Sequence, residues 1–186
     1  QSYFQNFNDN TTYSYLKKFF INITELGSSA WYLGLSLFFI IIFWINKKFK
    51  FLRIKKDNKI SNLFLSSFCY IIIAGIVTQI GKHIIGRPRP NYSNFESGLN
   101  FSFFTFDSSY HSFPSGHSST IFMVCFIFCA TLPRLKYFFY FFASIIAFSR
   151  VIVGAHFFSD ILAGALLALI VFKILNYIVE NKYKKY

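Results

Sequence analysis

Five apolar segments of nearly membrane-spanning length dominate this 186-residue sequence. They run over residues 28–46, 61–80, 118–132, 137–153 and 157–179. A helix needs about 20 mostly apolar residues to cross the hydrocarbon core of a bilayer. Within that core a single helix forms all of its backbone hydrogen bonds internally. Of all residues, 54% are hydrophobic and only 14% are charged, which is unusual for a soluble domain. The sequence therefore predicts an all-α integral membrane protein.

The rest of the chain leaves room for a single membrane domain. Residues 13–25 mix lysines with aromatic and aliphatic side chains, which suits a short helix lying at the membrane interface. We therefore divide the chain into a polar N-terminal segment with an interfacial helix, 1–27, and a transmembrane domain, 28–186. We allow for a sixth spanning helix, supplied either by 13–25 or by sequence that precedes Gln1.

The formal net charge of +12 is concentrated at the ends of apolar segments. The basic residues there are Lys47, Lys48, Lys50, Arg53, Lys55, Lys56 and Lys59 in one connection, Arg134 and Lys136 in another, and Lys182, Lys184 and Lys185 at the end. This is the positive-inside pattern of membrane proteins. Nucleic acid is the weaker interpretation, because no recognition motif accompanies the charge. Counting crossings places the long polar connection 81–117 and the turn 150–156 together on the other, extracytoplasmic side.

Three short clusters on that side contain nearly all the reactive side chains. They are Lys82 with Arg89-Pro90, then Pro114-Ser115-Gly116-His117, then Ser149-Arg150 with His156 and Asp160. Ionisable residues at membrane ends are functional candidates, because unpaired charges cost several kcal/mol there. A phosphoryl group in transfer carries negative charge on three oxygens, which the side chains of Lys82, Arg89 and Arg150 can clamp. The clusters therefore predict a phosphate pocket.

The remaining motif residues fit the other roles of phosphoryl transfer. Ser115 and Gly116 lie where a loop meets a helix start, so their backbone N–H groups and the hydroxyl can add donors to the phosphate oxygens. His156 and Asp160 are four residues apart, which predicts one helical face where the carboxylate holds one ring proton and the other nitrogen attacks. His117 would protonate the leaving oxygen and later activate water.

The complete pattern resembles the type 2 phosphatidic acid phosphatase superfamily, and every motif position from Lys82 to Asp160 matches. The resemblance implies a six-helix bundle core, with His156 as the nucleophile, whereas the sequence shows five clear spans, so we expect five to six transmembrane helices. It also implies metal-independent hydrolysis, without a cofactor, of a lipid phosphate monoester or pyrophosphate. The small size is similar to that of bacterial inner-membrane enzymes. Lipid A at its 1-phosphate is the favoured substrate, with undecaprenyl pyrophosphate, phosphatidylglycerol phosphate and phosphatidate as alternatives.

Other interpretations stay open at this point, and the oligomeric state is not indicated. A phosphotransferase between two lipids would use the same residues with a second acceptor site. A non-enzymatic lipid-binding or anion-binding protein would need the cations but not the couple of His156 and Asp160. That couple could be purely structural or bind Zn²⁺, although three nearby cations disfavour a metal. We expect His83, Arg87 and His111 to be solvated loop residues.

Overall fold

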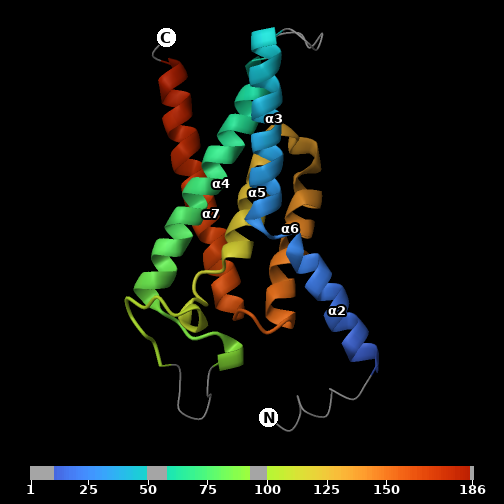
Figure 1. Ribbon diagram of the computed structural model, residues 1–186, viewed down its shortest axis with the longest axis vertical. Coiled ribbons are helices and arrows are strands. Elements are labelled where there is room, and N and C mark those ends of the chain that lie inside the picture. The colour runs from blue at the N-terminus through green and yellow to red at the C-terminus, as the bar shows by residue number, and fades with distance from the viewer. Residues whose placement is uncertain (1–10, 50–57, 93–99, 185–186) are drawn as a thin grey trace.

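The structure is a computed structural model that describes residues 11–49, 58–92 and 100–184 (Figure 1). The polar segment before residue 11, the middle of the basic linker 47–60 and part of the loop 81–117 lie outside the described residues. The α-helices, labelled as in Figure 1, are α2 (Thr11–Glu25), α3 (Ser29–Phe49), α4 (Asn58–Ile85), α5 (Gly116–Thr131), α6 (Lys136–Ile152) and α7 (Phe158–Lys184). Short 3-10 turns are η1 (Pro90–Tyr92), η3 (Ser108–Tyr110) and η4 (Pro133–Leu135). The predicted all-α fold is confirmed.

Each predicted span corresponds to one helix, from α3 to α7. Four stretches of the described residues are long and apolar enough to cross a membrane, namely Tyr15–Phe49, Ile60–Tyr92, Pro133–Ile152 and Phe158–Asn181. Helix α5 is apolar but has only 16 residues, about 24 Å of helix against roughly 30 Å of hydrocarbon. Because α5 contacts α4, α6 and α7, longer helices enclose it.

Helix α4 is longer than the sequence predicts. The predicted span ends at Ile80, whereas the helix continues to Ile85. It stops where Gly86 adopts a positive φ of 54°, a conformation that glycine takes up without steric cost. The Gly86 N–H donates to the Lys82 carbonyl oxygen at 3.0 Å. Lys82 therefore lies on the last turn of a rigid helix and not in a loop.

Helix α5 is the centre of the hydrophobic core. On one side its Met123 packs in a buried cluster with Ala74 of α4 and Ala168 of α7. On the other side its Cys125 packs in a second cluster with Ala147 of α6. Small residues on the neighbouring helices let the backbones approach closely, as is common inside membranes. This packing fixes the start of α5 between the ends of its neighbours.

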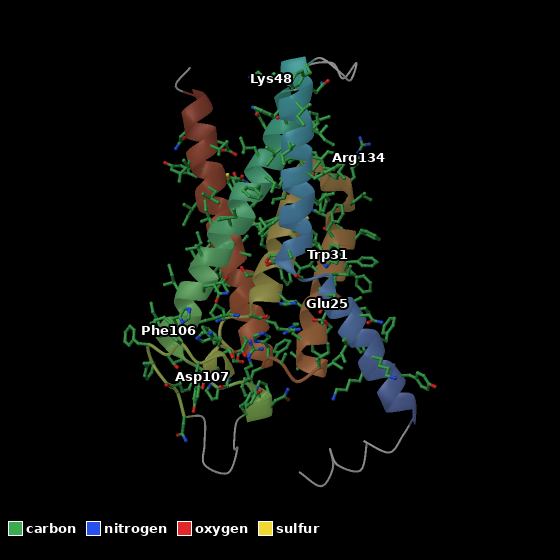
Figure 2. The ribbon with its side chains drawn as sticks, in the orientation of Figure 1. Glu25, Trp31, Lys48, Phe106, Asp107 and Arg134 are labelled. Carbon is green, nitrogen blue, oxygen red and sulfur yellow. The ribbon has the colours of Figure 1, made fainter. Side chains whose placement is uncertain are left out.

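The labelled basic residues beside the linkers, Lys48 and Arg134, and the reactive loops lie toward opposite ends of the bundle. Figure 2 shows Lys48 and Arg134 toward one end and Phe106 and Asp107 at the other. The connection from α4 to α5 and the turn from α6 to α7 both lie at the second end (Figure 1). The arrangement expected from counting crossings is therefore present.

Helix α2 crosses obliquely at the second end and packs against α6 (Figure 1). Its inward face consists of Phe20, Ile23 and Thr24, followed by Gly27 just past the helix end, with the spacing of one helical stripe. Thr24 and Gly27 are buried. A Cβ atom on Gly27 would lie 3.1 Å from the Cβ atom of His117. The predicted interfacial helix thus contributes to the end of the bundle where the reactive residues lie.

Gly164 of α7 allows this helix to lie against the start of α5. A Cβ atom at this position would lie 2.5 Å from the Ser115 carbonyl oxygen and 3.0 Å from the Ser118 Cβ atom. Protein interiors are too closely packed to absorb such contacts without moving a helix.

We therefore expect Gly164→Ala to lower the thermal unfolding midpoint of the purified protein in detergent. Gly75→Ala on α4 is the matched control, because a Cβ atom there meets no atom within 4 Å. Alanine favours a helix over glycine by roughly 1 kcal/mol, so the control should keep or raise the midpoint. A midpoint for Gly164→Ala at or above that of Gly75→Ala would contradict the packing described here.

Candidate active site

Asp160 is the residue around which the polar site is assembled. Its side chain is fully buried in the first turn of α7. One carboxylate oxygen accepts from Arg87 Nη1 at 2.7 Å, and the other accepts from Ser112 Oγ at 2.6 Å and from the Phe157 N–H at 2.9 Å. Its backbone carbonyl oxygen accepts from the Ser115 N–H at 3.0 Å. One residue thus joins the α4–α5 connection to the starts of α5 and α7.

The surroundings of Asp160 explain how a charge can be buried there. A buried carboxylate is strongly destabilising unless a cation and hydrogen-bond donors compensate it. Arg87 supplies the cation, and Ser112 and the Phe157 N–H supply further donors. The bond to the Phe157 N–H is also one half of a capping box, and a negative charge at a helix N-terminus is favourable.

The prediction that Arg87 is a solvated loop residue is wrong. Its side chain is only 14% exposed, and its guanidinium carbon lies 4.2 Å from the centroid of the Phe157 ring. It also donates to Ser159 Oγ at 2.7 Å. Arg87 belongs to none of the three motif clusters, so the motifs could not identify it. The signal in the sequence was that a buried Asp160 would require a cation.

His156 is oriented differently from the prediction. Its Nδ1 lies 2.7 Å from the Ser112 carbonyl oxygen and 3.7 Å from Asp160 Oδ2. Because a carbonyl oxygen only accepts hydrogen bonds, Nδ1 carries the proton and Nε2 keeps its lone pair. Helix α7 begins at Phe158, so His156 precedes the helix. Asp160 still faces the ring, as predicted, and it also holds Ser112.

Three cations act on His156. Burial lowers the pKa of His156, the hydrogen-bonding influence of Asp160 opposes that shift, and the charges of Arg150, Arg89 and Lys82 lower it further. The sign of the shift means that the imidazole is neutral at neutral pH, and the neutral ring is the nucleophilic form. The structure therefore brings together the predicted cations and the predicted nucleophile.

Arg150 presents an unpaired donor in the site. Its Nη1 donates to Thr24 Oγ1 of α2 at 3.2 Å. Its Nε is buried and has no hydrogen-bond partner among the described residues. Buried donors are rarely left unpaired in proteins, so this atom suits an acceptor oxygen of a ligand. The sequence motifs did not identify Thr24.

The other two cations approach from the α4 side. Lys82 Nζ lies next to Gly116, 3.5 Å from where a Cβ atom of that glycine would be. Arg89 is held by its own loop, with Nε donating to the Ser108 carbonyl oxygen at 3.1 Å. Lys82 interacts electrostatically with both Arg89 and Arg150. Like charges gathered in this way repel one another, and a bound anion would relieve the repulsion.

Ser115 serves the fold as well as the site. Its hydroxyl caps α5 by accepting from the Ser118 N–H at 3.4 Å. The expectation that the Ser115 N–H donates to phosphate is wrong, because this N–H donates to the backbone carbonyl oxygen of Asp160. A hydroxyl can accept and donate at once, so the capping bond is compatible with donation to a ligand. His117 follows in the first turn of α5, where burial and then the charges of Arg150 and His156 lower its pKa to about 4. The negative charge of a bound phosphate opposes that shift, so His117 takes up its proton together with the substrate.

His83 and His111 are not simply solvated, contrary to the prediction. Their rings meet edge to face with centroids 4.4 Å apart. His83 Nδ1 lies 2.9 Å and His111 Nε2 3.1 Å from the same Thr105 carbonyl oxygen. His111 is buried. These two histidines fix the α4–α5 connection.

Comparisons with known proteins place the chain in a family. The family model of the PAP2 superfamily matches residues 63–184. The chain is 32% identical over 148 residues to the lipid A 1-phosphatase of Rhizobium etli, which is 76% of this chain and 62% of that protein. It is 32% identical over 147 residues to the lipid A 1-phosphatase of Rhizobium johnstonii, 76% of this chain and 59% of that protein. The chain thus spans about three fifths of the length of these curated relatives.

Two solved membrane proteins share the fold. The phosphatidylglycerolphosphate phosphatase of PAP2 type from Bacillus subtilis superposes with a TM-score of 0.62 at 24% identity, covering 90% of this chain and 78% of that one. LpxE of Aquifex aeolicus superposes with a TM-score of 0.52 at 22% identity, covering 86% of this chain and 84% of that one. At these identities the likeness concerns the helix bundle.

The ion pair of Arg87 and Asp160 yields a prediction for stability. Removing one partner of a buried pair costs about 3–5 kcal/mol, because the other charge stays buried. We expect Arg87→Gln to lower the thermal unfolding midpoint strongly, whereas Arg134→Gln, an exposed arginine at the other end, should leave it nearly unchanged. The double variant with Asp160→Asn should lose less than the sum of the single variants. Equal midpoints for the two arginine variants would refute the role of Arg87.

Proposed function

The chain belongs to the PAP2 superfamily, and we propose that it is an integral-membrane lipid phosphatase that works through a phosphohistidine on His156. The observation that carries the proposal is the hydrogen bond from Nδ1 to the Ser112 carbonyl oxygen at 2.7 Å. It leaves the Nε2 lone pair of a buried imidazole to face a substrate, with three cations acting on the same ring. A protein that only binds an anion would need the cations but no oriented imidazole.

In the proposed first step, His156 Nε2 attacks the phosphorus atom and the bond from phosphorus to the lipid oxygen breaks. His117 donates its proton to that departing oxygen. Lys82, Arg89 and Arg150 bind the phosphoryl oxygens, whose charge is greatest in the transition state. The hydrogen bond from Nδ1 to Ser112 keeps the ring in the attacking orientation throughout.

In the proposed second step, water attacks the phosphohistidine. His117, now deprotonated, accepts a proton from the water molecule as the oxygen bonds to phosphorus. The bond from phosphorus to Nε2 breaks, inorganic phosphate leaves and His156 returns to its neutral form. Every group that acts in the two steps is a side chain of this chain, so we expect the reaction to need no added metal.

We propose lipid A, at its 1-phosphate, as the substrate. The support comes from the two Rhizobium relatives, whose names give that activity. The two solved structures support the fold and do not bear on the substrate. The cation cluster would bind the phosphate of the sugar head group, while the apolar helices keep the rest of the lipid in the bilayer.

We also propose that the site faces the extracytoplasmic side of a bacterial inner membrane. Lys48 and Arg134 mark the end of the bundle opposite to the reactive loops (Figure 2), and basic residues favour the cytoplasmic side. The phosphatase domain is proposed to be 28–186, with the α2 helix of the preceding segment closing the site through Thr24 and Gly27.

The test is phosphate release by the purified protein in detergent from lipid A, phosphatidylglycerol phosphate, phosphatidate and undecaprenyl pyrophosphate. We expect release to be greatest with lipid A and unchanged by a chelator. His156→Ala should lower kcat by about 10³-fold or more, the scale on which nucleophile losses act. Arg134→Ala, at an exposed position toward the opposite end of the bundle, is the control and should retain most activity. Release by His156→Ala equal to that of the parent would refute the mechanism.

A further inference from the structure

An apolar groove lies beside the polar site and extends into the membrane-spanning part of the bundle. It has a volume of about 880 Å³, within the roughly 300–1,000 Å³ usual for ligand pockets. Helices α6 and α7 form its walls, and Phe122 of α5 lies between them. Helix α2 crosses one end with Phe20 and Ile23. Ser144 is its one polar lining residue.

The groove passes beside the polar site, because Ile152 at the end of α6 and Phe158 at the start of α7 also line it. Ile146 and Ala147 of α6 line it, and Arg150 lies one helical turn beyond them on the same face. On α7, the lining residue Ile161 directly follows the buried Asp160. On α2, Ile23 lines the groove while its neighbour Thr24 binds Arg150. On all three helices, therefore, residues that line the groove lie within one turn of a residue of the polar site.

We propose that this groove holds one hydrocarbon chain of the substrate lipid while its phosphate lies at Lys82, Arg89 and Arg150. The inference rests on the proposed function for the class of substrate. The complementarity is twofold, because the cations match the phosphate and the lining matches an acyl or prenyl chain. A similar groove of about 840 Å³ lies at the other end of the bundle, between the start of α4 and the end of α7, where the phosphate-binding cations do not reach.

The groove contributes orientation more than affinity. A hydrocarbon chain gains little by moving from a bilayer to an apolar protein surface, because lipid tails are as apolar as leucine. A chain fixed between α6 and α7 nevertheless restricts where its head group can lie. That restriction would hold the phosphorus atom in line with His156 Nε2, which is how positioning accelerates a reaction.

The experiment uses an analogue of lipid A in which a methylene phosphonate, which has no ester bond to cut, replaces the 1-phosphate, with a photoreactive diazirine within one acyl chain. The parent protein in phosphatidylcholine nanodiscs is irradiated with this probe or with a probe of lipid A without the 1-phosphate, which carries the same chain. Peptide mapping then locates the label. If the probe is merely one of the lipids around the bundle, it will label both grooves whatever its head group is. If its chain is bound as a substrate chain, the groove beside the polar site will be labelled in excess, and this excess will require the phosphonate.

We expect the phosphonate probe to label the groove segments 141–148 and 158–165 about tenfold more than the probe without the 1-phosphate, since one hydrogen bond to a charged group can give this factor. Ala165→Trp, which fills the groove, should abolish the excess. The matched variant Ala130→Trp, in the groove at the other end, should leave it intact. Equal labelling by the two probes in the parent would overturn the inference, whatever the variants do.

The outcome is independent of the test of the proposed function. Phosphate release together with equal labelling by the two probes would retain the phosphatase and reject the chain site. Phosphonate-dependent labelling without release of phosphate from any lipid would retain the chain site and reject the phosphatase.

Discussion

Burying the Asp160 carboxylate at the start of α7 constrains every other part of the site. The carboxylate requires Arg87 and Ser112 as partners, and both belong to the connection that follows α4. That connection is thereby held against α7, and the Ser112 carbonyl oxygen meets His156 Nδ1. A buried ion pair is weak evidence for net stability. Its effect here is positional, because it holds the Ser112 carbonyl oxygen where that oxygen accepts a hydrogen bond from His156 Nδ1.

The membrane part of the fold serves the same end of the bundle. Helix α5 is short and enclosed by its neighbours. The polar loop that precedes α5 therefore lies between neighbouring helices that are still apolar at that depth. Gly164 allows α7 to lie against the start of α5, which places Asp160 beside Ser115. Cations and an apolar groove therefore adjoin each other, the arrangement that an amphipathic lipid needs.

Much of this arrangement could be predicted from the sequence. The apolar segments predicted helices α3 to α7, and the three motif clusters predicted residues that do gather at one end. The misses have local causes. Gly86, and not the first charged residue, ends α4, and His156 precedes α7 rather than lying on it. Arg87, Thr24 and the Ser112 carbonyl group act through contacts between distant segments, which no local pattern in one sequence reveals.

The central claim, transfer of phosphate to His156, is tested most directly by rapid-quench kinetics with His117→Ala and 4-nitrophenyl phosphate. The nitrophenolate leaving group needs no general acid, so the first step proceeds while the attack of water is slowed. The account predicts a burst of about one nitrophenolate per protein molecule, with alkali-stable phosphate on His156. Steady release of nitrophenolate without a burst and without protein-bound phosphate would contradict it.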